Sequence, residues 1–412
     1  MQRRHVLTRA LQLAAGWSVG RAAWAADEAP SPRLVVVFLR GAVDGLSVVV
    51  PHADPAYQRA RPTLALGRPG TEGGALDLGG PWGLHPALAP LLPLWQSQRL
   101  AFVHAAGSPD ATRSHFDAQD FMESGTPDRK STADGWMNRL LGTLPASPGD
   151  APSPTRAVSI GAVLPRIYAG PQSVANIASG AGATRPLALD RPRVAQAFDA
   201  LYQGEDTLSR AYQDAQLARR EVMASIAPSM EAEMLAANNG APLPDGFPGD
   251  AARLATLMRN DPRVQLAFMA VGGWDTHANQ GAATGQLANR LAPLGQGLAT
   301  LAERLGPVLD QTVIVVMSEF GRTVRQNGNG GTDHGHGNVL WLLGGPVAGG
   351  KVHGAWPGLD DSALYEGRDL AITTDFRQVL AGIAEKHLRL PDARLAQVFP
   401  GWSGADAGVL RA

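Results

Sequence analysis

An uninterrupted β-branched run near residue 312 constrains the fold of this chain more than any other feature. Residues 312–317 (TVIVVM) contain three valines and one isoleucine and no charge. Such a run is typical of a strand buried on both faces, as in a mostly parallel sheet covered by helices. Glu319 and Arg322 follow it almost at once. Because open α/β sheets bind ligands beyond the carboxyl ends of their strands, we expect a functional site here.

Further apolar runs indicate the remaining strands of the same sheet. Residues 34–39, 100–104 and 264–271 are expected to be long strands, and helical periodicity over about 250–260 and 285–305 predicts helices between them. Shorter strands are expected at 158–160, 339–345 and 351–354, with a last helix over about 374–388. The pattern predicts an α/β fold, with loops over 51–66 and in the tail.

The first 25 residues are predicted to be a signal peptide. A pair of arginines at positions 3–4 precedes a weakly apolar segment, and residues 23–25 (AWA) offer a cleavage site. The paired arginines favour the twin-arginine route, so we expect the twin-arginine translocase as a partner and a periplasmic or otherwise exported location. A disordered basic tail is the alternative.

Residues 26–412 are expected to form a single domain. An amphipathic stretch over about 191–240 predicts a helical insertion on the α/β body. No segment is apolar for long enough to predict a stable membrane span.

Composition limits the chemistry available to the chain. There are no cysteines, which excludes disulfides, thiol catalysis and cysteine metal sites. The net charge of −1 gives no basic excess to suggest nucleic acid. A metal would therefore be held by His, Asp or Glu, which favours zinc, manganese, magnesium or calcium.

Acidic and imidazole groups gather in the loops that follow four predicted strands. One such loop is weak evidence for a functional site, because turn aspartates and capping histidines are common. Four of them in a chain without cysteine predict a site for two metal ions, which would clamp the attacking and leaving oxygens of phosphoryl or sulfuryl transfer. The residues concerned are Asp44, His115, Asp275, His277, Glu319, Asp333, His334 and His336.

Ser114 and His115 are the expected catalytic residues. Ser114 stands at the start of a predicted helix, where free N–H groups and the helix dipole would favour a nucleophile. A simple N-cap is the alternative. Three arginines in the same loops could bind the oxygens of a phosphate or sulfate: Arg40, Arg113 and Arg322.

Five segments together resemble the signatures of domain-of-unknown-function family 1501. They are residues 39–46 (LRGAVDGL), 113–116 (RSHF), 273–277 (GWDTH), 318–323 (SEFGRT) and 331–335 (GTDHG). The resemblance runs in order from about residue 33 to 390. It implies an exported member of the alkaline phosphatase and sulfatase superfamily, with a three-layer sandwich of helices around a mixed, mostly parallel sheet.

The resemblance also implies roles for individual residues. Asp44 resembles the acidic ligand after the first strand, and Ser114 resembles the nucleophile. Asp275 and His277 resemble ligands of one metal, completed by His334 or His336, and Glu319 resembles the acidic ligand of a second. The chain departs from the superfamily in having Glu319-Phe320 where Asp-His is usual, and in the short spacing between Asp275 and His277.

Two functions are consistent with these features. The first is an exported hydrolase of small-molecule or polymer-borne phosphate or sulfate esters, with a serine nucleophile and one or two divalent metal ions. The alternative is a non-catalytic exported binding or assembly protein that keeps the superfamily fold, because a fold alone does not establish a function.

Overall fold

The computed structural model of the protein describes residues 31–130, 132–145, 154–180 and 237–411. The predicted signal peptide lies outside the described residues, as does nearly all of the predicted helical insertion. The described fold belongs to the unit Pro32–Ala412. None of the described helices is long and apolar enough to cross a membrane.

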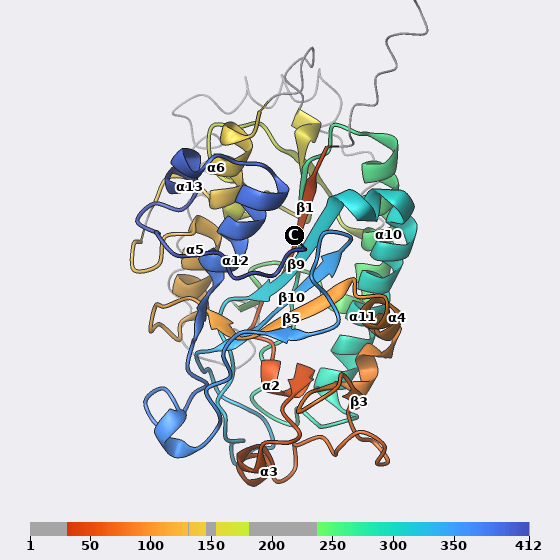
Figure 1. The fold of residues 1–412 in the computed structure, drawn as a ribbon, viewed down its shortest axis with the longest axis vertical. Helices are drawn as coiled ribbons and strands as arrows, with labels where there is room; N and C mark the ends of the chain where they lie inside the picture. The colour runs from red at the N-terminus through yellow and green to blue at the C-terminus, as the bar shows by residue number, and fades with distance from the viewer. Residues whose placement is uncertain (1–30, 131, 146–153, 181–236, 412) are drawn as a thin grey trace, which may run out of the picture. The chain divides into compact units, whose positions relative to one another are not determined.

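A nine-stranded sheet forms the centre of the fold (Figure 1). Strand β12 pairs with β5 at one side of the main path. The order along the sheet is β11 (Val352–His353), β5 (Leu100–Gly107), β10 (Asn338–Gly344), β9 (Thr312–Ser318), β1 (Arg33–Leu39), β8 (Leu266–Val271), β6 (Ala157–Ile160) and β7 (Ala175–Ile177), with β12 at Thr374–Asp375.

The sheet is mixed but mostly parallel. The first strand, β1, lies between β8 and β9 and is parallel to both, so that Val36 is in register with Phe268 and Val315. Strand β10 is antiparallel to its neighbours β5 and β9. All seven residues of β1 and of β9 are buried. Their continuous apolar sequences follow from this burial, because a central strand covered on both faces has no polar side.

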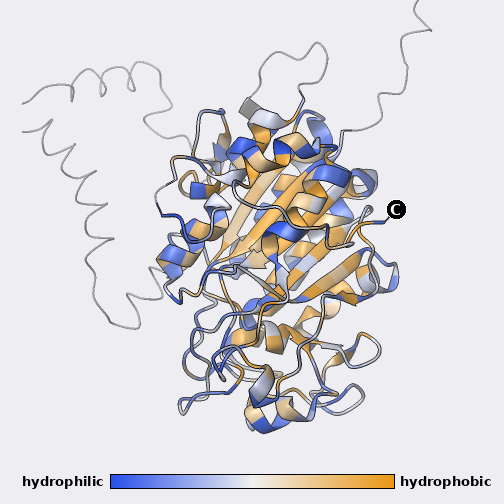
Figure 2. Ribbon diagram, turned by 60° about the vertical axis from the view of Figure 1, so that its left-hand side comes forward, coloured by the Kyte–Doolittle hydropathy of each residue, from blue (hydrophilic) through white to orange (hydrophobic). Residues whose placement is uncertain are grey.

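Helices cover both faces of the sheet. The side chains of β1 alternate between two cores: Val35 and Val37 belong to one, and Val36 and Phe38 belong to the other. Figure 2 shows the hydrophobic residues concentrated along these strands. The first core includes residues of η1 (Pro86–Leu91), α10 (Phe247–Asn260) and α11 (Gln286–Leu305), and the second includes residues of α5 (His115–Ser124), α6 (Trp136–Thr143), α12 (Phe376–Gly382) and α13 (Asp392–Val398). The predicted three-layer α/β arrangement is therefore confirmed.

Short elements account for most differences from the sequence prediction. The predicted loop 51–66 contains α3 (Pro55–Ala60), whose first turn is capped by Asp54 through the Ala56 N–H. The tail predicted as loop contains α13. A small second sheet joins β2 (Val49–Val50), β4 (Gly83–Leu84) and β3 (Leu76–Asp77). Elements of two to seven residues are too short to produce a periodic pattern. The chain also includes α2 (Gly45–Val48) and α4 (Leu92–Gln96).

The loops that carry the candidate functional residues lie at one edge of the sheet. Strands β1, β8, β9 and β5 all point towards it, and the segment between β9 and the antiparallel β10 turns back at the same edge. The loops approach one another closely. Gly41 has φ of +110°, and a Cβ atom there would lie 2.9 Å from the Asp275 backbone nitrogen. A Cβ on Gly321 would lie 1.8 Å from the Gly337 carbonyl oxygen, so neither position accepts a side chain without rearrangement.

Candidate metal centre

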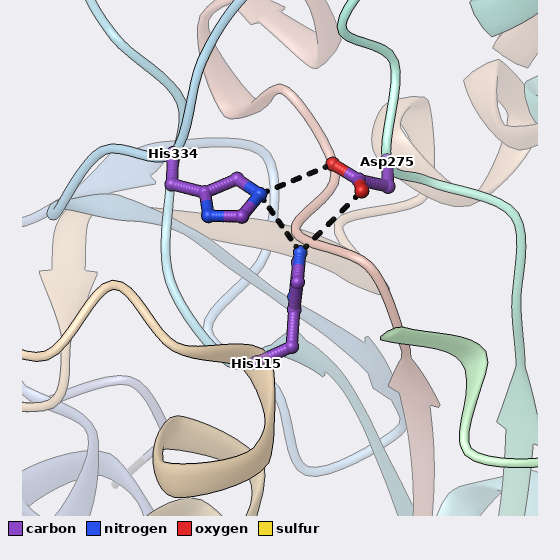
Figure 3. Close-up of side chains that lie close together, drawn as sticks. All are labelled: His115, Asp275 and His334. Atoms are coloured by element: carbon purple, nitrogen blue, oxygen red, sulfur yellow. Dashed lines mark hydrogen bonds and ion pairs between the residues drawn. The ribbon is translucent and has the colours of Figure 1, made fainter. Parts of the chain in front are cut away.

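His115, Asp275 and His334 converge at this edge from three different loops (Figure 3), and His277, from the same loop as Asp275, lies beside them. His334 Nε2 lies 3.0 Å from His115 Nε2 and 3.0 Å from His277 Nε2. Asp275 Oδ1 lies 3.0 Å from His277 Nε2 and 3.4 Å from His334 Nε2, and its Oδ2 lies 3.7 Å from His115 Nε2. The potential ligand atoms of His115, Asp275 and His334 all lie within 4.8 Å of one another. His115, Asp275 and His334 therefore form a compact donor group, and His277 adjoins it through His334 and Asp275.

The opposite nitrogen of each imidazole has an oxygen partner. His115 Nδ1 lies 2.8 Å from Glu319 Oε1, and His334 Nδ1 lies 2.8 Å from the Arg113 carbonyl oxygen. Because a carboxylate and a carbonyl only accept, both Nδ1 atoms donate, and in the neutral ring each Nε2 keeps its lone pair. Two lone pairs facing each other at 3.0 Å repel, so a cation must lie between them. His277 Nδ1 similarly lies 3.1 Å from Asp333 Oδ1.

Asp275 is held in place by Arg322. The guanidinium of this buried arginine donates to Asp275 Oδ1 and to the carbonyl oxygens of Gly41, Ala42 and Trp274. Asp275 Oδ2 is buried, and among the described residues it has no hydrogen-bond partner. A buried carboxylate oxygen without a partner is costly. A bound cation would satisfy it.

The surrounding charges favour a cation at this centre. Burial lowers the pKa of His115, but hydrogen bonds and charge from Asp275 and Glu319 outweigh burial and raise it to about 9. Burial raises the pKa of Asp275, but bonds from the three histidines and the charge of Arg322 bring it far below its usual range. The hydrogen bond to Asp275 raises the pKa of His277. A proton fills this role in metal-free protein, and a metal ion would displace it.

The donor set fits a divalent transition metal. Three imidazole nitrogens and one carboxylate oxygen match the ligands of zinc and of other first-row divalent ions, whereas magnesium and calcium prefer oxygen donors alone. The side chains of Asp275 and His115 are almost fully buried, while those of His277 and His334 are 19% and 15% exposed. One side of the centre is thus open to solvent.

Glu319 supports the centre from behind and does not face it. Its Oε1 accepts from His115 Nδ1, from the Gly41 backbone N–H at 2.7 Å and from Gln119 Nε2 at 2.9 Å. Burial raises the pKa of Glu319, but the bond and charge of His115 outweigh it and lower the pKa to about 2. The predicted ligand role disagrees with this geometry, because the oxygen facing His115 is already shared by three donors. Carboxylates that orient a ligating histidine are a recurrent feature of metal sites.

Phe320 follows Glu319 and lies against the centre. Its buried ring packs against two histidines of the centre, with ring centroids 4.8 Å from His115 and 5.2 Å from His334. It therefore contributes an apolar wall in place of an imidazole. Together with the orientation of Glu319, this apolar wall leaves the donors for one metal ion here, the smaller of the two numbers predicted.

Two other predicted ligands lie elsewhere. Asp44 is buried in an ion pair with Arg61, at 2.6 and 3.0 Å, and its Oδ2 also accepts from Ser47 and Gln280. Both of its oxygens are thus occupied, which argues against metal binding. His336 is buried and stacks on Tyr365 with centroids 4.3 Å apart. The structure brings neither residue to the three histidines.

The three arginines predicted to contact substrate have other partners. Arg40 is buried and pairs with Glu123 at 2.7 Å and Gln119 at 2.6 Å. Arg113 pairs with Asp369 at 2.7 Å and with Glu366. Arg322 is directed towards Asp275 and backbone carbonyls, as described above. Arg40 and Arg322 thus use their donors on buried partners within the protein, whereas Arg113 is bound through Nε and Nη2 and its side chain is 28% exposed.

Ser114 precedes the first residue of α5 and is exposed. Its backbone has the extended conformation of an N-cap, but its hydroxyl makes no capping hydrogen bond. The next residue, His115, was predicted to be catalytic, and its ring belongs to the metal centre. The structure therefore places an uncapped serine hydroxyl directly beside a candidate metal ligand in the sequence.

Sequence reasoning did not single out two residues near the centre. Gln280 is buried and contacts Thr276 and Thr332, which adjoin the ligands. Arg290 on α11 approaches the loop after β8, where a Cβ on Gly273 would lie 3.2 Å from its Nε atom. Its described hydrogen bond, to Gln286, is 3.4 Å long. Burial lowers the pKa of Arg290, with the charge of Asp275 acting in the opposite direction. The sequence signal for Gln280 was its position three residues after His277.

Comparison with protein families agrees with the motifs. The family described as "Protein of unknown function (DUF1501)" matches residues 31–399. The chain belongs to this family. The five segments noted in the sequence all lie inside the match, and they contain every residue of the metal centre. No curated protein matches the sequence.

Solved structures resemble this DUF1501 protein only weakly. A 2-O GAG sulfatase, BT1596, is 10% identical with a TM-score of 0.40, covering 92% of this chain and 76% of its own. The PsFucS1 sulfatase from Pseudoalteromonas sp. is 12% identical with a TM-score of 0.37, covering 92% and 74%. A protein in the alkaline phosphatase superfamily from Vibrio parahaemolyticus is 10% identical with a TM-score of 0.35, covering 76% and 60%.

Proposed function

We propose that the protein is an exported hydrolase of phosphate or sulfate esters that uses one divalent metal ion held by His115, Asp275, His277 and His334. The observation that carries the proposal is that His334 Nε2 lies 3.0 Å from the Nε2 atoms of both His115 and His277, beside Asp275, whose buried Oδ2 has no hydrogen-bond partner among the described residues. Export rests on the predicted twin-arginine signal. A bound metal would polarise the oxygens of the ester and supply positive charge to the transition state.

We assign the nucleophile to Ser114. The serine oxygen would form the new bond to phosphorus or sulfur, and the alcohol would leave with a proton. Water would then hydrolyse the serine ester, regenerate the hydroxyl and release the inorganic acid. Support comes from the exposure of Ser114, its uncapped hydroxyl and its position at the amino terminus of α5. The free N–H groups of that helix end favour the negative charge of the ester.

We assign recognition of the anionic ester to Arg290. Its guanidinium is half-buried, lies against the loop that carries Asp275 and His277, and has one long described hydrogen bond. Donors that are not saturated within the protein are available to a phosphate or sulfate. Of the arginines first predicted for this role, Arg40 and Arg322 are buried and bound within the protein.

Turnover by purified protein tests the proposal. Zinc-loaded protein should hydrolyse aryl phosphates or aryl sulfates, and Ser114→Ala should abolish turnover. Ser97→Ala changes another exposed serine, beyond the end of α4, and should leave turnover intact. If the metal-loaded protein hydrolyses neither class of ester, the non-catalytic binding or assembly function becomes the better account.

A further inference from the structure

We propose that Gln280 is a positioning residue that locks the two ligand-bearing loops of the metal centre together and anchors them to Asp44. This inference rests on the proposed metal centre. The loop after β8 carries Asp275 and His277, and the loop after β9 carries His334. Because the two loops belong to different strands, something must fix their separation if the donor atoms are to meet at one point.

The side-chain oxygen of Gln280 bridges these loops. Gln280 Oε1 accepts from Thr276 Oγ1 at 2.8 Å and from Thr332 Oγ1 at 2.8 Å. Thr276 stands between the two ligands of the first loop, and Thr332 is two residues before His334. The Thr332 backbone N–H also donates to the Thr276 carbonyl oxygen at 3.2 Å. A single amide oxygen thus holds residues within two positions of three of the four candidate ligands.

The side-chain nitrogen of Gln280 ties the loops to the strand β1. Gln280 Nε2 donates to Asp44 Oδ2 at 2.7 Å. The carboxylate of Asp44 is itself fixed by Arg61, which donates onward to the carbonyl oxygens of Thr323 and Val324 at 2.9 Å. The network therefore reaches the loops after β1, β8 and β9, the three adjacent parallel strands at the centre of the sheet.

The chemistry of the bridge requires an amide. The two threonine hydroxyls need an acceptor, while the Asp44 carboxylate needs a donor, and the side chain of glutamine supplies both. Gln280, Thr276, Thr332 and Asp44 are all almost fully buried, so water does not readily replace a lost partner. Residues behind the ligands that fix their orientation commonly change metal affinity by about 10- to 100-fold when they are replaced.

Gln280→Met tests the inference, because methionine keeps the length of the side chain and removes both polar groups. Asn138→Leu is a matched control: Asn138 is a buried amide that donates to the carbonyl oxygens of Tyr168 and Gln172 and has no described contact with the ligand loops. Zinc affinity is measured by competition with a chelator, and cobalt-substituted protein reports ligand geometry through its visible absorption. The thermal midpoint of metal-free protein reports stability separately.

We expect Gln280→Met to weaken zinc binding by about 10- to 100-fold and to alter the cobalt spectrum. Asn138→Leu should lower the thermal midpoint while leaving both metal readouts unchanged. If the wild-type protein binds no metal, the proposed function fails. If the wild-type protein binds zinc and Gln280→Met binds it equally well with the same cobalt spectrum, the metal centre stands and the positioning role of Gln280 is refuted. Should Gln280→Met not fold, Thr276→Val and Thr332→Val each remove one hydrogen bond and should each weaken zinc binding.

Discussion

Replacing Glu319 by glutamine separates support of a ligand from direct metal binding. The carboxylate accepts from His115 at 2.8 Å, from the Gly41 N–H at 2.7 Å and from Gln119 at 2.9 Å, all through Oε1. A glutamine whose carbonyl oxygen takes that position still accepts from all three donors. Its NH₂ group then faces the Ser318 hydroxyl, which lies 2.9 Å from Oε2 in the native protein and can accept. Glu319→Gln therefore removes charge and keeps the geometry.

The expected loss follows from that difference. Without the negative charge, His115 is a less basic ligand, and zinc affinity should fall by about 10-fold, or about 1.4 kcal/mol. Glu319→Leu also removes the acceptor, and its loss should approach 100-fold, or about 2.7 kcal/mol. Chelator competition at fixed pH measures both values.

A second buried carboxylate provides the control. Glu123 pairs with Arg40 at 2.7 Å and accepts from the Ile167 N–H, and no described contact joins it to the histidines. Glu123→Gln should destabilise the protein without changing zinc affinity. If Glu319→Gln bound zinc as tightly as the wild type, the supporting role would be refuted. If it abolished binding as completely as His115→Ala, Glu319 would be a ligand, as the sequence first suggested.

Three further predictions concern the nucleophile, the anion and the buried ion pair. Ser114→Ala should abolish ester hydrolysis while elemental analysis finds the metal content unchanged, since its hydroxyl is outside the four-donor set. Arg290→Ala should raise KM by about 10-fold, as expected for loss of a charged hydrogen bond of about 1.5 kcal/mol, and an unchanged KM would exclude the contact. Asp44→Asn should cost about 3–5 kcal/mol at pH 7 by leaving Arg61 buried without its partner, measured by urea unfolding. Burial raises the pKa of Asp44 but bonds to Arg61, Ser47 and Gln280 lower it below 3.8, so the native advantage over Asp44→Asn is complete above that pH and should shrink as the pH falls further.

The layers of the fold could be predicted from the sequence because burial imposes an unmistakable pattern on the strands. Residues 313–317 and 34–39 are apolar at every position, and both strands are covered on both faces. Helix α11 was equally clear, with a long apolar stripe from Gln286 to Leu305. The sequence does not predict helix α13 or the two-residue strands, because their stability comes from contacts with distant parts of the chain.

The site was predicted in location but only partly in roles. The rule that ligands bind beyond the carboxyl ends of strands pointed to this edge, and the geometry brings Asp275, His277 and His334 together there. That rule does not say which side chains face inward. Glu319 and Asp44 are chemically able to bind a metal. However, Glu319 accepts hydrogen bonds from Gly41 N–H and His115, and Asp44 pairs with Arg61. The partners of Glu319 lie more than 200 positions away, and Arg61 lies 17 residues from Asp44, so no local pattern encodes these pairings.

The number of bound metal ions tests the central claim most directly. Elemental analysis of the purified protein, compared with its Asp275→Asn and His115→Ala variants, measures this number. The geometry predicts about one divalent transition-metal ion per chain in the wild type and a large loss in both variants. His115, Asp275 and His334 form one compact donor group, whereas the other predicted acidic ligands, Asp44 and Glu319, have partners within the protein. A metal-free wild type, or two ions per chain that both variants retain, would contradict the account.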